Sequence, residues 1–480
     1  MDRVRPAATG KAVEAEMKRA SHRLWYFAAL AVIGFGSAVG ARAATDPGFL
    51  LTATAKDFAS YFPGQLGNGY LSTLTAPRGT EGNLAYLVAF MDYAQGDIAR
   101  PAAVPGWSEI DYSTGNSPAG HFWLNQAALD PAVFQDYQQQ LNLHEGTLTT
   151  RYRYLDHDRA TRIEVTSLVS QASPHLAATR LSITPEFDGE VQLSFALNLW
   201  APHQPRFPLA RLSGDEMQEA VAAHNLKLEP VAPATPDRAV LWYHGDTHVT
   251  AADGDTADRT LWLDGHAEQG LSMAEAAAIE LPAGLQPTDL RVYRSSYRLA
   301  LNLTAKVRKG QTYTFTKFVA LSRAGWGGDA QQDRALATAA RTAGFERLLD
   351  AHRHAWSELW TSDIRIDGDP QAQQVVHSDL YYLLSNTAPD TAWPTGACGM
   401  TPGYAGHVFW DSDTWVFPAL LLLHPQRAKS LVMFRSRTLP AAEARAQARG
   451  LRGAMFPWEA DPQDGSEQTP HMAYVLGERE

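Results

Sequence analysis

Residues Val191–Leu199 read Val-Gln-Leu-Ser-Phe-Ala-Leu-Asn-Leu, in which apolar side chains alternate with polar or small ones. Successive side chains of a β-strand point to opposite faces, so this pattern predicts a half-buried strand. The same period of two recurs in Leu148–Tyr154, at Ile163 and Val165, and in Leu299–Leu303. Asp188-Gly189 and Lys309-Gly310 mark turns, and no helical pattern separates the strands. We therefore predict antiparallel sheets that pack as a sandwich over residues 50–325.

The period changes to that of a helix after Trp326-Gly327-Gly328. One stripe follows at helical spacing and consists of Phe345, Leu348, Leu349, His352, Trp356 and Leu359. Residues 326–370 are therefore predicted to be a helical linker, and Pro370 suits the first turn of the next helix. Residues 371–480 are predicted to be mainly helical, with candidate helices over Trp415–Leu423 and Pro425–Arg437. The predicted class is α+β with several domains.

Composition excludes several kinds of protein. The 480 residues are 45% apolar, which is enough to bury sizeable cores, and the net charge of -11 is spread along the chain. No basic run is present, so nucleic acid is not an expected partner. The single cysteine, Cys398, allows no intrachain disulfide and is expected to be a buried structural thiol. The sequence has neither a CxxC nor an HExxH motif, so we expect no metal and no cofactor.

The N-terminus has the pattern of a secretory signal. Basic residues precede an uncharged run over Leu24–Ala41, and Ala41-Arg42-Ala43 fits a cleavage site. We expect residues 1–43 to be a signal peptide, with Met17 as a possible true start. The location would then be the periplasm or the exterior, with no stable membrane partner after cleavage. The alternative is an uncleaved anchor, because the run approaches the ~18 to 20 residues that span a bilayer.

The residues that point to chemistry lie between Gly406 and Pro470. They are Gly-His-Val-Phe-Trp-Asp-Ser-Asp-Thr-Trp at Gly406–Trp415, then Arg435 and Arg437, then Gly453–Glu459 and Gly465–Pro470. Carboxylates beside tryptophans can accept hydrogen bonds from sugar hydroxyls next to an aromatic stacking face. This pairing is typical of a pyranose-binding wall.

These segments closely resemble glycoside hydrolase family 65. The family carries the motif Gly-His-x-Phe-Trp-Asp, an Arg-containing helix, and Gly-Ala-x-Phe-Pro-Trp-Glu and Gly-x-Glu-x-Thr-Pro segments. Gly67–Leu71 and Trp356–Asp369 are similar to two further motifs of the family. The resemblance implies a β-super-sandwich, a helical linker and an (α/α)6 barrel of the six-hairpin glycosidase type that cleaves α-glucosidic bonds with inversion.

The resemblance also implies roles for residues. Trp410 and Asp411 would contact the glucosyl unit of an α-linked glucoside, while Asp413, His407, Glu459 and Glu467 would contact substrate or support the site. Trp415 and Trp458 are expected in the core on base rates for aromatics. Inversion needs two carboxyl groups ~6.5 to 9.5 Å apart.

No catalytic residue is assigned in this chain. The family's general acid is a Glu expected beyond Glu480, and the 110 residues of 371–480 are too few for twelve helices of about 11 residues each. We therefore expect an incomplete barrel in a C-terminally truncated chain that is inactive as it stands.

Three interpretations stay open at the level of sequence. The first is an exported inverting hydrolase of the trehalase, kojibiose-hydrolysing or glucosylgalactosyl-hydroxylysine glucosidase kind, which the export pattern favours. The second is a disaccharide phosphorylase of the same family, in which phosphate replaces water. The third is a remnant that binds carbohydrate without catalysis or has no stable function. The sequence does not indicate the linkage cleaved or the oligomeric state.

Overall fold

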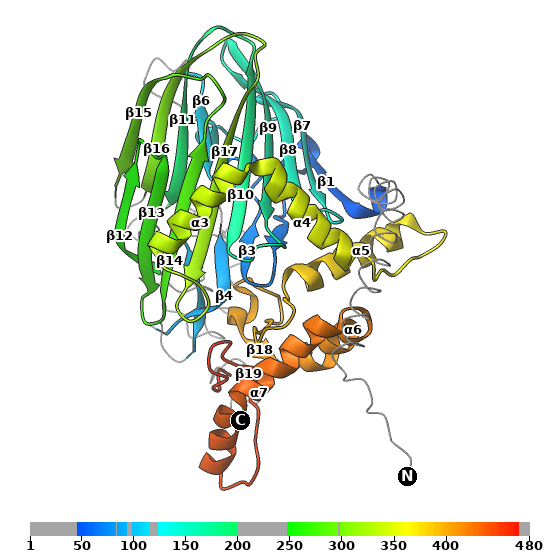
Figure 1. Ribbon diagram of the computed structural model, residues 1–480. Coiled ribbons are helices and arrows are strands. Elements are labelled where there is room, and N and C mark those ends of the chain that lie inside the picture. Colours follow the sequence, from blue (N-terminus) through cyan, green and yellow to red (C-terminus); the bar gives the residue numbers. More distant parts are fainter. Residues whose placement is uncertain are drawn as a thin grey trace, which may run out of the picture.

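The computed structural model describes residues 46–82, 84–93, 98–115, 123–198, 247–295 and 298–469. The expected signal peptide and Met17 lie outside the described residues, as do Leu199 and the chain from Pro470 onward. The described part consists of a large N-terminal sheet domain followed by a helical part, which is the coarse arrangement predicted (Figure 1). Among the residues described, no helix is long and apolar enough to cross a membrane.

The largest sheet has nine antiparallel strands. In spatial order they are β1 (Leu50–Thr54), β7 (Phe134–Asn142), β8 (Thr147–Asp156), β9 (Arg159–Val169), β10 (Leu176–Pro185), β17 (Tyr313–Arg323), β14 (Ser272–Glu280), β13 (Thr260–Ala267) and β12 (Thr247–Asp255).

Two four-stranded antiparallel sheets accompany it. One is formed by β15 (Pro287–Arg294), β16 (Arg298–Val307), β11 (Gly189–Asn198) and β6 (Ile110–Ser113). The other is formed by β2 (Gln65–Gly67), β3 (Leu71–Leu74), β4 (Ala85–Asp92) and β5 (Arg100–Val104). Short 3₁₀ turns occur at η1 (Pro47–Phe49), η2 (Ala55–Ser60), η3 (Leu124–Gln126) and η6 (Gly403–Gly406).

The core lies between the nine-stranded sheet and the sheet that contains β11. Val191, Leu193, Phe195 and Leu197 of β11 are fully buried, as predicted, but Ser194 and Ala196 between them are buried as well, so this part of the strand is not half-buried. Phe195 packs against Phe315 of β17 in the opposite sheet, with ring centroids 5.9 Å apart. The strand periodicity therefore decides which side chains meet between the layers.

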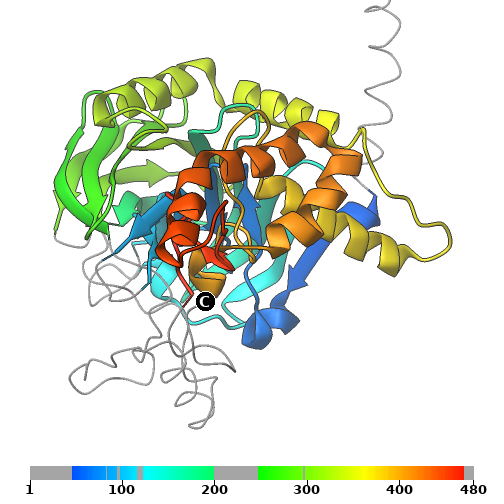
Figure 2. The same cartoon turned by 90° about the horizontal axis from the view of Figure 1, so that it is seen from below.

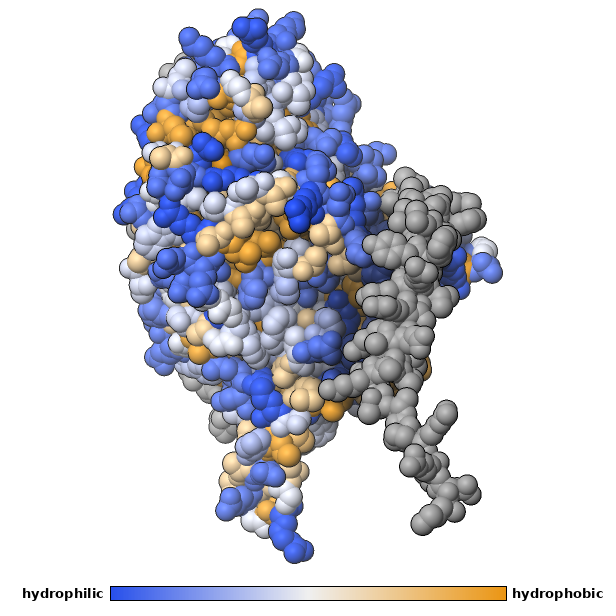
Figure 3. All heavy atoms as spheres, in the orientation of Figure 1, coloured by the Kyte–Doolittle hydropathy of each residue, from blue (hydrophilic) through white to orange (hydrophobic). Residues whose placement is uncertain are grey.

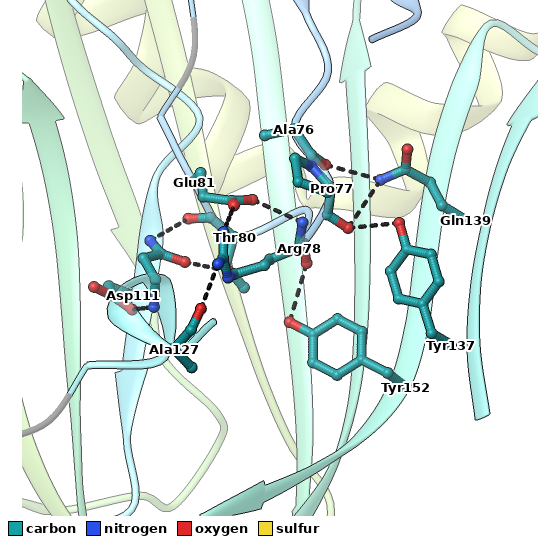
Figure 4. A network of polar contacts seen from close by, with 11 residues as sticks. Ala76, Pro77, Arg78, Thr80, Glu81, Asp111, Ala127, Tyr137, Gln139 and Tyr152 are labelled. Carbon is teal, nitrogen blue, oxygen red and sulfur yellow. Dashed lines mark hydrogen bonds and ion pairs between the residues drawn. The ribbon is translucent and has the colours of Figure 1, made fainter. Parts of the chain in front are cut away.

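One loop is held in place by side chains of the nine-stranded sheet (Figure 4). It connects β3 to β4, and its carbonyl groups point at strands β7 and β8. Tyr137 donates to the oxygen of Pro77, Tyr152 to that of Arg78 and Gln139 to that of Ala76, at 2.7, 3.0 and 2.9 Å. Buried backbone carbonyls need such partners, so the strands fix the path of this loop.

Two helices lie across the outer face of the nine-stranded sheet (Figure 1). α3 (Ala330–Ala343) and α4 (Phe345–Leu359) place Ala337, Ala340, Phe345, Leu348 and Leu349 in one apolar cluster with residues of β10, β14 and β17. His352 and Trp356 of the predicted stripe are also buried. The change from strands to helices falls between Arg323 and Ala330.

The helical part begins with α5 (Pro370–Ser385), whose first residue is the proline that the sequence placed there. It continues with a π-helical turn over Ser412–Val416, then α6 (Phe417–Leu423) and α7 (Pro425–Ala448). Seen from below, α6 and α7 lie over the end of the sheet domain (Figure 2). The two-stranded sheet of β18 (Val408–Phe409) and β19 (Glu459–Ala460) lies beside α7.

The predicted end of the last helix was wrong. The helix was expected to stop at Arg437, yet α7 continues through Pro440 to Ala448. A buried stripe of Phe434, Thr438, Ala442 and Ala446 runs past the proline, while Pro440 itself is exposed. Packing of this face therefore outweighs the hydrogen bond that proline removes.

Two burial predictions were also wrong. Cys398 is exposed, and Trp415 is 74% exposed, because the π-helical turn carries it on its outer side. Trp458 is partly buried. Further apolar side chains of α6 and α7 are exposed, and Figure 3 shows apolar residues on the projecting lower part of the molecule. The exposed apolar residues of these helices are Leu421, Leu422, Val432, Met433 and Leu439.

Candidate functional site

A two-stranded ribbon carries the residues singled out from the sequence. Strand β18 pairs with β19 so that Val408 lies opposite Ala460 and Phe409 opposite Glu459. The ribbon brings together two segments that are 50 residues apart in the chain. Val408 and Ala460 pack on Phe434 of α7, which gives the ribbon a small core of its own.

Trp410 and Asp411 follow directly after β18. The indole of Trp410 is 46% exposed and Asp411 is exposed at the start of the π-helical turn. A solvent-facing indole next to a solvent-facing carboxylate can offer one stacking face and two acceptor oxygens to the same ligand. Both side chains are therefore open to a ligand, and the contacts to a glucosyl unit that the sequence assigned to them stay predictions.

Asp413 faces Arg435 of α7. The guanidinium donates to the Asp413 carboxylate from Nε at 3.0 Å and from Nη2 at 2.6 Å, and Nη2 also donates to the carbonyl oxygen of Phe409 at 3.1 Å. A paired donor fork of this kind fixes both position and orientation. Asp413 thus connects the π-helical turn to α7. Arg435 is a site residue that the motif analysis named without a role.

His407 and Glu459 form a buried pair behind the ribbon. Nδ1 of His407 lies 2.8 Å from Oε2 of Glu459, and the two side chains are 0% and 3% exposed. Burial raises the pKa of Glu459, and the bond from His407 opposes that rise. Neither side chain reaches the surface next to Trp410. Both are therefore placed to support the ribbon and not to contact a ligand.

Glu467 lies at the other side of β19. It forms an ion pair with Arg445 of α7, and its Oε1 accepts from the N–H and the hydroxyl of Thr469 at 3.0 and 2.6 Å. Glu467 therefore closes the loop after the ribbon against α7.

Two aromatic rings pack against Phe409 at the end of β18. Phe409 meets Tyr404 and Trp458 edge to face, with centroids 5.5 and 5.7 Å apart. Tyr404 is 63% exposed and takes a left-handed backbone conformation at φ 51°. Left-handed φ is costly for such a residue, and backbone strain of this kind is concentrated at functional sites.

The buried carboxyl of Asp461 follows β19. Its Oδ1 accepts from the N–H groups of Gln463 and Asp464, and burial raises its pKa. Asp461 is 0% exposed, so it shapes the loop after the ribbon. Within the described ranges no cluster of three metal-binding side chains occurs.

Comparison with known proteins assigns both parts of the chain. Residues 98–359 match the model described as glycosyl hydrolase family 65, N-terminal domain, and residues 377–479 match the central catalytic domain of that family. A solved structure named "Putative kojibiose phosphorylase from human microbiome" superposes with a TM-score of 0.67 at 18% identity, over 88% of this chain and 53% of that one. This similarity supports the fold.

Two relatives are named kojibiose hydrolase. The protein of Mucilaginibacter mallensis is 44% identical over 173 residues, which cover 36% of this chain and 25% of the relative. The protein of Flavobacterium johnsoniae is 41% identical over 190 residues, which cover 39% and 28%. The matches therefore span about a quarter of the length of these relatives.

Proposed function

Because the chain belongs to glycosyl hydrolase family 65, we propose that its ribbon is the glucosyl-binding wall of an enzyme that acts on α-glucosides. The observation that carries this proposal is the pair of exposed side chains, Trp410 and Asp411, on a ribbon that is bonded to α7 and to the sheet domain. A rigid platform of this kind binds a pyranose at low entropic cost.

We assign hydrolysis with inversion as the reaction. Two relatives named kojibiose hydrolase support hydrolysis, and the secretory pattern of residues 1–43 supports a place in the periplasm or outside the cell. An exported phosphorylase would form its sugar phosphate outside the cytoplasm, where the cell does not retain it. Phosphorolysis is the second candidate, because the similar solved structure is named as a phosphorylase.

We further propose that α5, α6 and α7 are helices of an (α/α)6 barrel and that Asp413 and Arg435 hold its sugar-facing turn. None of the described carboxyl groups is assigned as general acid. Glu459 and Asp461 are buried, and Glu467 forms an ion pair with Arg445. The activity that we assign to the described residues is glucoside binding.

Calorimetric titration of the purified chain with kojibiose, trehalose and maltose tests the proposal. We expect at least one disaccharide to bind, and Asp411→Asn and Trp410→Ala to weaken that binding about tenfold or more, since each removes a direct contact. The variant Asp350→Asn, on the exposed face of α4, should bind as the wild type does. Absence of binding to all three sugars would refute the proposed function.

Turnover is measured on the same samples. Release of glucose without phosphate indicates hydrolysis, and release of glucose 1-phosphate only with phosphate indicates the second candidate.

A further inference from the structure

Ala99, which lies just before β5, connects the sheet domain to both sides of the ribbon. The carbonyl oxygen of Ala99 is 2.8 Å from Nε2 of His407, and its N–H donates to Oε1 of Gln468 at 2.6 Å. Both backbone groups of one residue are therefore held by side chains of the helical part. Close packing supports the same contact, since a Cβ atom at Gly406 would lie 3.1 Å from Pro101.

The two side chains that hold Ala99 come from the two sides of the ribbon. His407 directly precedes β18, and Gln468 follows β19, where its N–H donates to the oxygen of Glu459 at 2.9 Å. The contacts form a closed path from Ala99 through His407, Glu459 and Gln468 back to Ala99. A closed path of this kind resists rotation of the ribbon as well as its separation from the sheet domain.

The partners of His407 determine where its proton lies. A carbonyl oxygen only accepts, so Nε2 of His407 must carry a hydrogen to bond to Ala99. The contact of 2.8 Å between Nδ1 and Glu459 then needs one further proton, shared between imidazole and carboxyl. The pair is neutral overall with that proton in place, which suits two side chains that are almost fully buried.

We propose that His407 is a positioning residue: together with Glu459 it fixes the ribbon that presents Trp410 and Asp411 at a set orientation to the sheet domain. This inference rests on the proposed function, because the oriented residues are those assigned to the glucosyl unit. Trp410 lies only three residues after His407, with the paired strand between them. A small tilt of the ribbon therefore moves the indole and the carboxylate together.

Four variants test this role by disaccharide titration. Glu459→Gln keeps a donor toward Nδ1 of His407, whereas Glu459→Met keeps the volume and loses the bond. We expect Glu459→Gln to bind within about threefold of wild type and Glu459→Met and His407→Leu to bind about tenfold more weakly. His352→Gln is the matched control, because His352 is also fully buried and bonds to the oxygen of Gly146, far from the ribbon.

Equal affinity of Glu459→Gln, Glu459→Met and wild type would overturn the positioning role while leaving the proposed function intact. Loss of affinity in His352→Gln to the same extent would also overturn it, since any buried histidine would then have the effect. If wild type binds no glucoside, the proposed function fails, and hydrogen exchange decides the remaining claim. Faster exchange at the Ala99 amide and over 406–411 in Glu459→Met, but not in Glu459→Gln, supports the anchor, and unchanged exchange refutes it.

Discussion

The Nζ atom of Lys317 lies 2.8 Å from the carbonyl oxygen of Ala196, so a side chain of β17 donates to the backbone of β11 across the core. Lys317 also donates to the oxygen of Glu109, and it is fully buried. Burial lowers the pKa of Lys317 to about 7 and raises that of the buried carboxyl of Glu275. The two sheets are therefore joined by polar groups as well as by apolar packing.

Replacement of Lys317 by Met should destabilise the sheet domain by about 3 kcal/mol, because two buried carbonyl groups and Glu275 lose a cationic partner. Urea unfolding, monitored by circular dichroism, measures the loss in the free energy of unfolding. The double variant Lys317→Met/Glu275→Leu should recover about half of the loss, since it also removes the buried carboxyl of Glu275, whose oxygens have no hydrogen-bond partner among the described residues. If the stability losses of the two single variants simply add in the double variant, Lys317 and Glu275 are not coupled, which would contradict this prediction.

Stability should depend on pH through Asp333, in the first turn of α3. Burial raises the pKa of Asp333 to about 7, while its carboxylate accepts from Ser322 at 2.6 Å. A pKa that is higher in the folded than in the unfolded state favours folding when the group is protonated. The contribution is complete below about pH 4 and is lost as the pH rises toward 7, at up to about 1.4 kcal/mol per unit.

The variant Asp333→Asn removes this dependence. Its free energy of unfolding should therefore rise relative to that of wild type between pH 4.5 and 7, as measured by urea titration at several pH values. Parallel pH profiles for the two proteins would show that Asp333 does not titrate in this range.

The docking of the linker helix should be sensitive to a single methyl group. A Cβ atom at Gly146, which has φ 61°, would lie 2.0 Å from Nε1 of Trp356 in α4. Gly146→Ala should therefore cost about 3 kcal/mol or more in unfolding free energy. Gly310→Ala is the control, because Gly310 has φ 77° with nothing within 4 Å, and should cost only about 1 kcal/mol. Equal losses would mean that backbone conformation, not contact with Trp356, sets the effect.

Arg435 should matter for ligand binding more than for stability. Arg435→Lys retains the charge but loses the paired hydrogen bonds that Nε and Nη2 donate to Asp413. The π-helical turn next to Trp410 therefore becomes less ordered. We expect glucoside affinity to fall about fivefold by calorimetry. Arg334→Lys on α3 changes the ion pairs with Asp255 and Asp258 in the same way and should leave affinity unchanged. A matching loss in both variants would argue against a local effect.

Local sequence patterns predicted the strands and helices well where one face is buried. The stripe from Phe345 to Trp356 is buried, as the spacing indicated, and so are the apolar positions of β11, although Ser194 and Ala196 between them are also buried. The local pattern failed where packing against a segment distant in the sequence decides where a helix ends. The helix was expected to end at Arg437, but packing of Phe434 and Ala442 carries α7 onward through Pro440.

Motifs similarly identified the segments of the site without the contacts between them. His407 and Glu459 were both singled out, yet they are 52 positions apart in the chain, and only the pairing of β18 with β19 brings the two side chains to 2.8 Å. Ala99 had no signal at all, because its backbone forms the bonds and any residue type has the same N–H and C=O groups.

The sequence by itself determined the order of a sheet domain before a helical part, the family, and the exposed candidates Trp410 and Asp411, because periodicity and motifs are local properties of the chain. The tertiary structure alone decided that His407 faces Ala99, that Asp413 is held by Arg435 and that Trp415 faces solvent. Those outcomes depend on which distant segments pack together, and the free energy of that packing is not contained in any one stretch of residues.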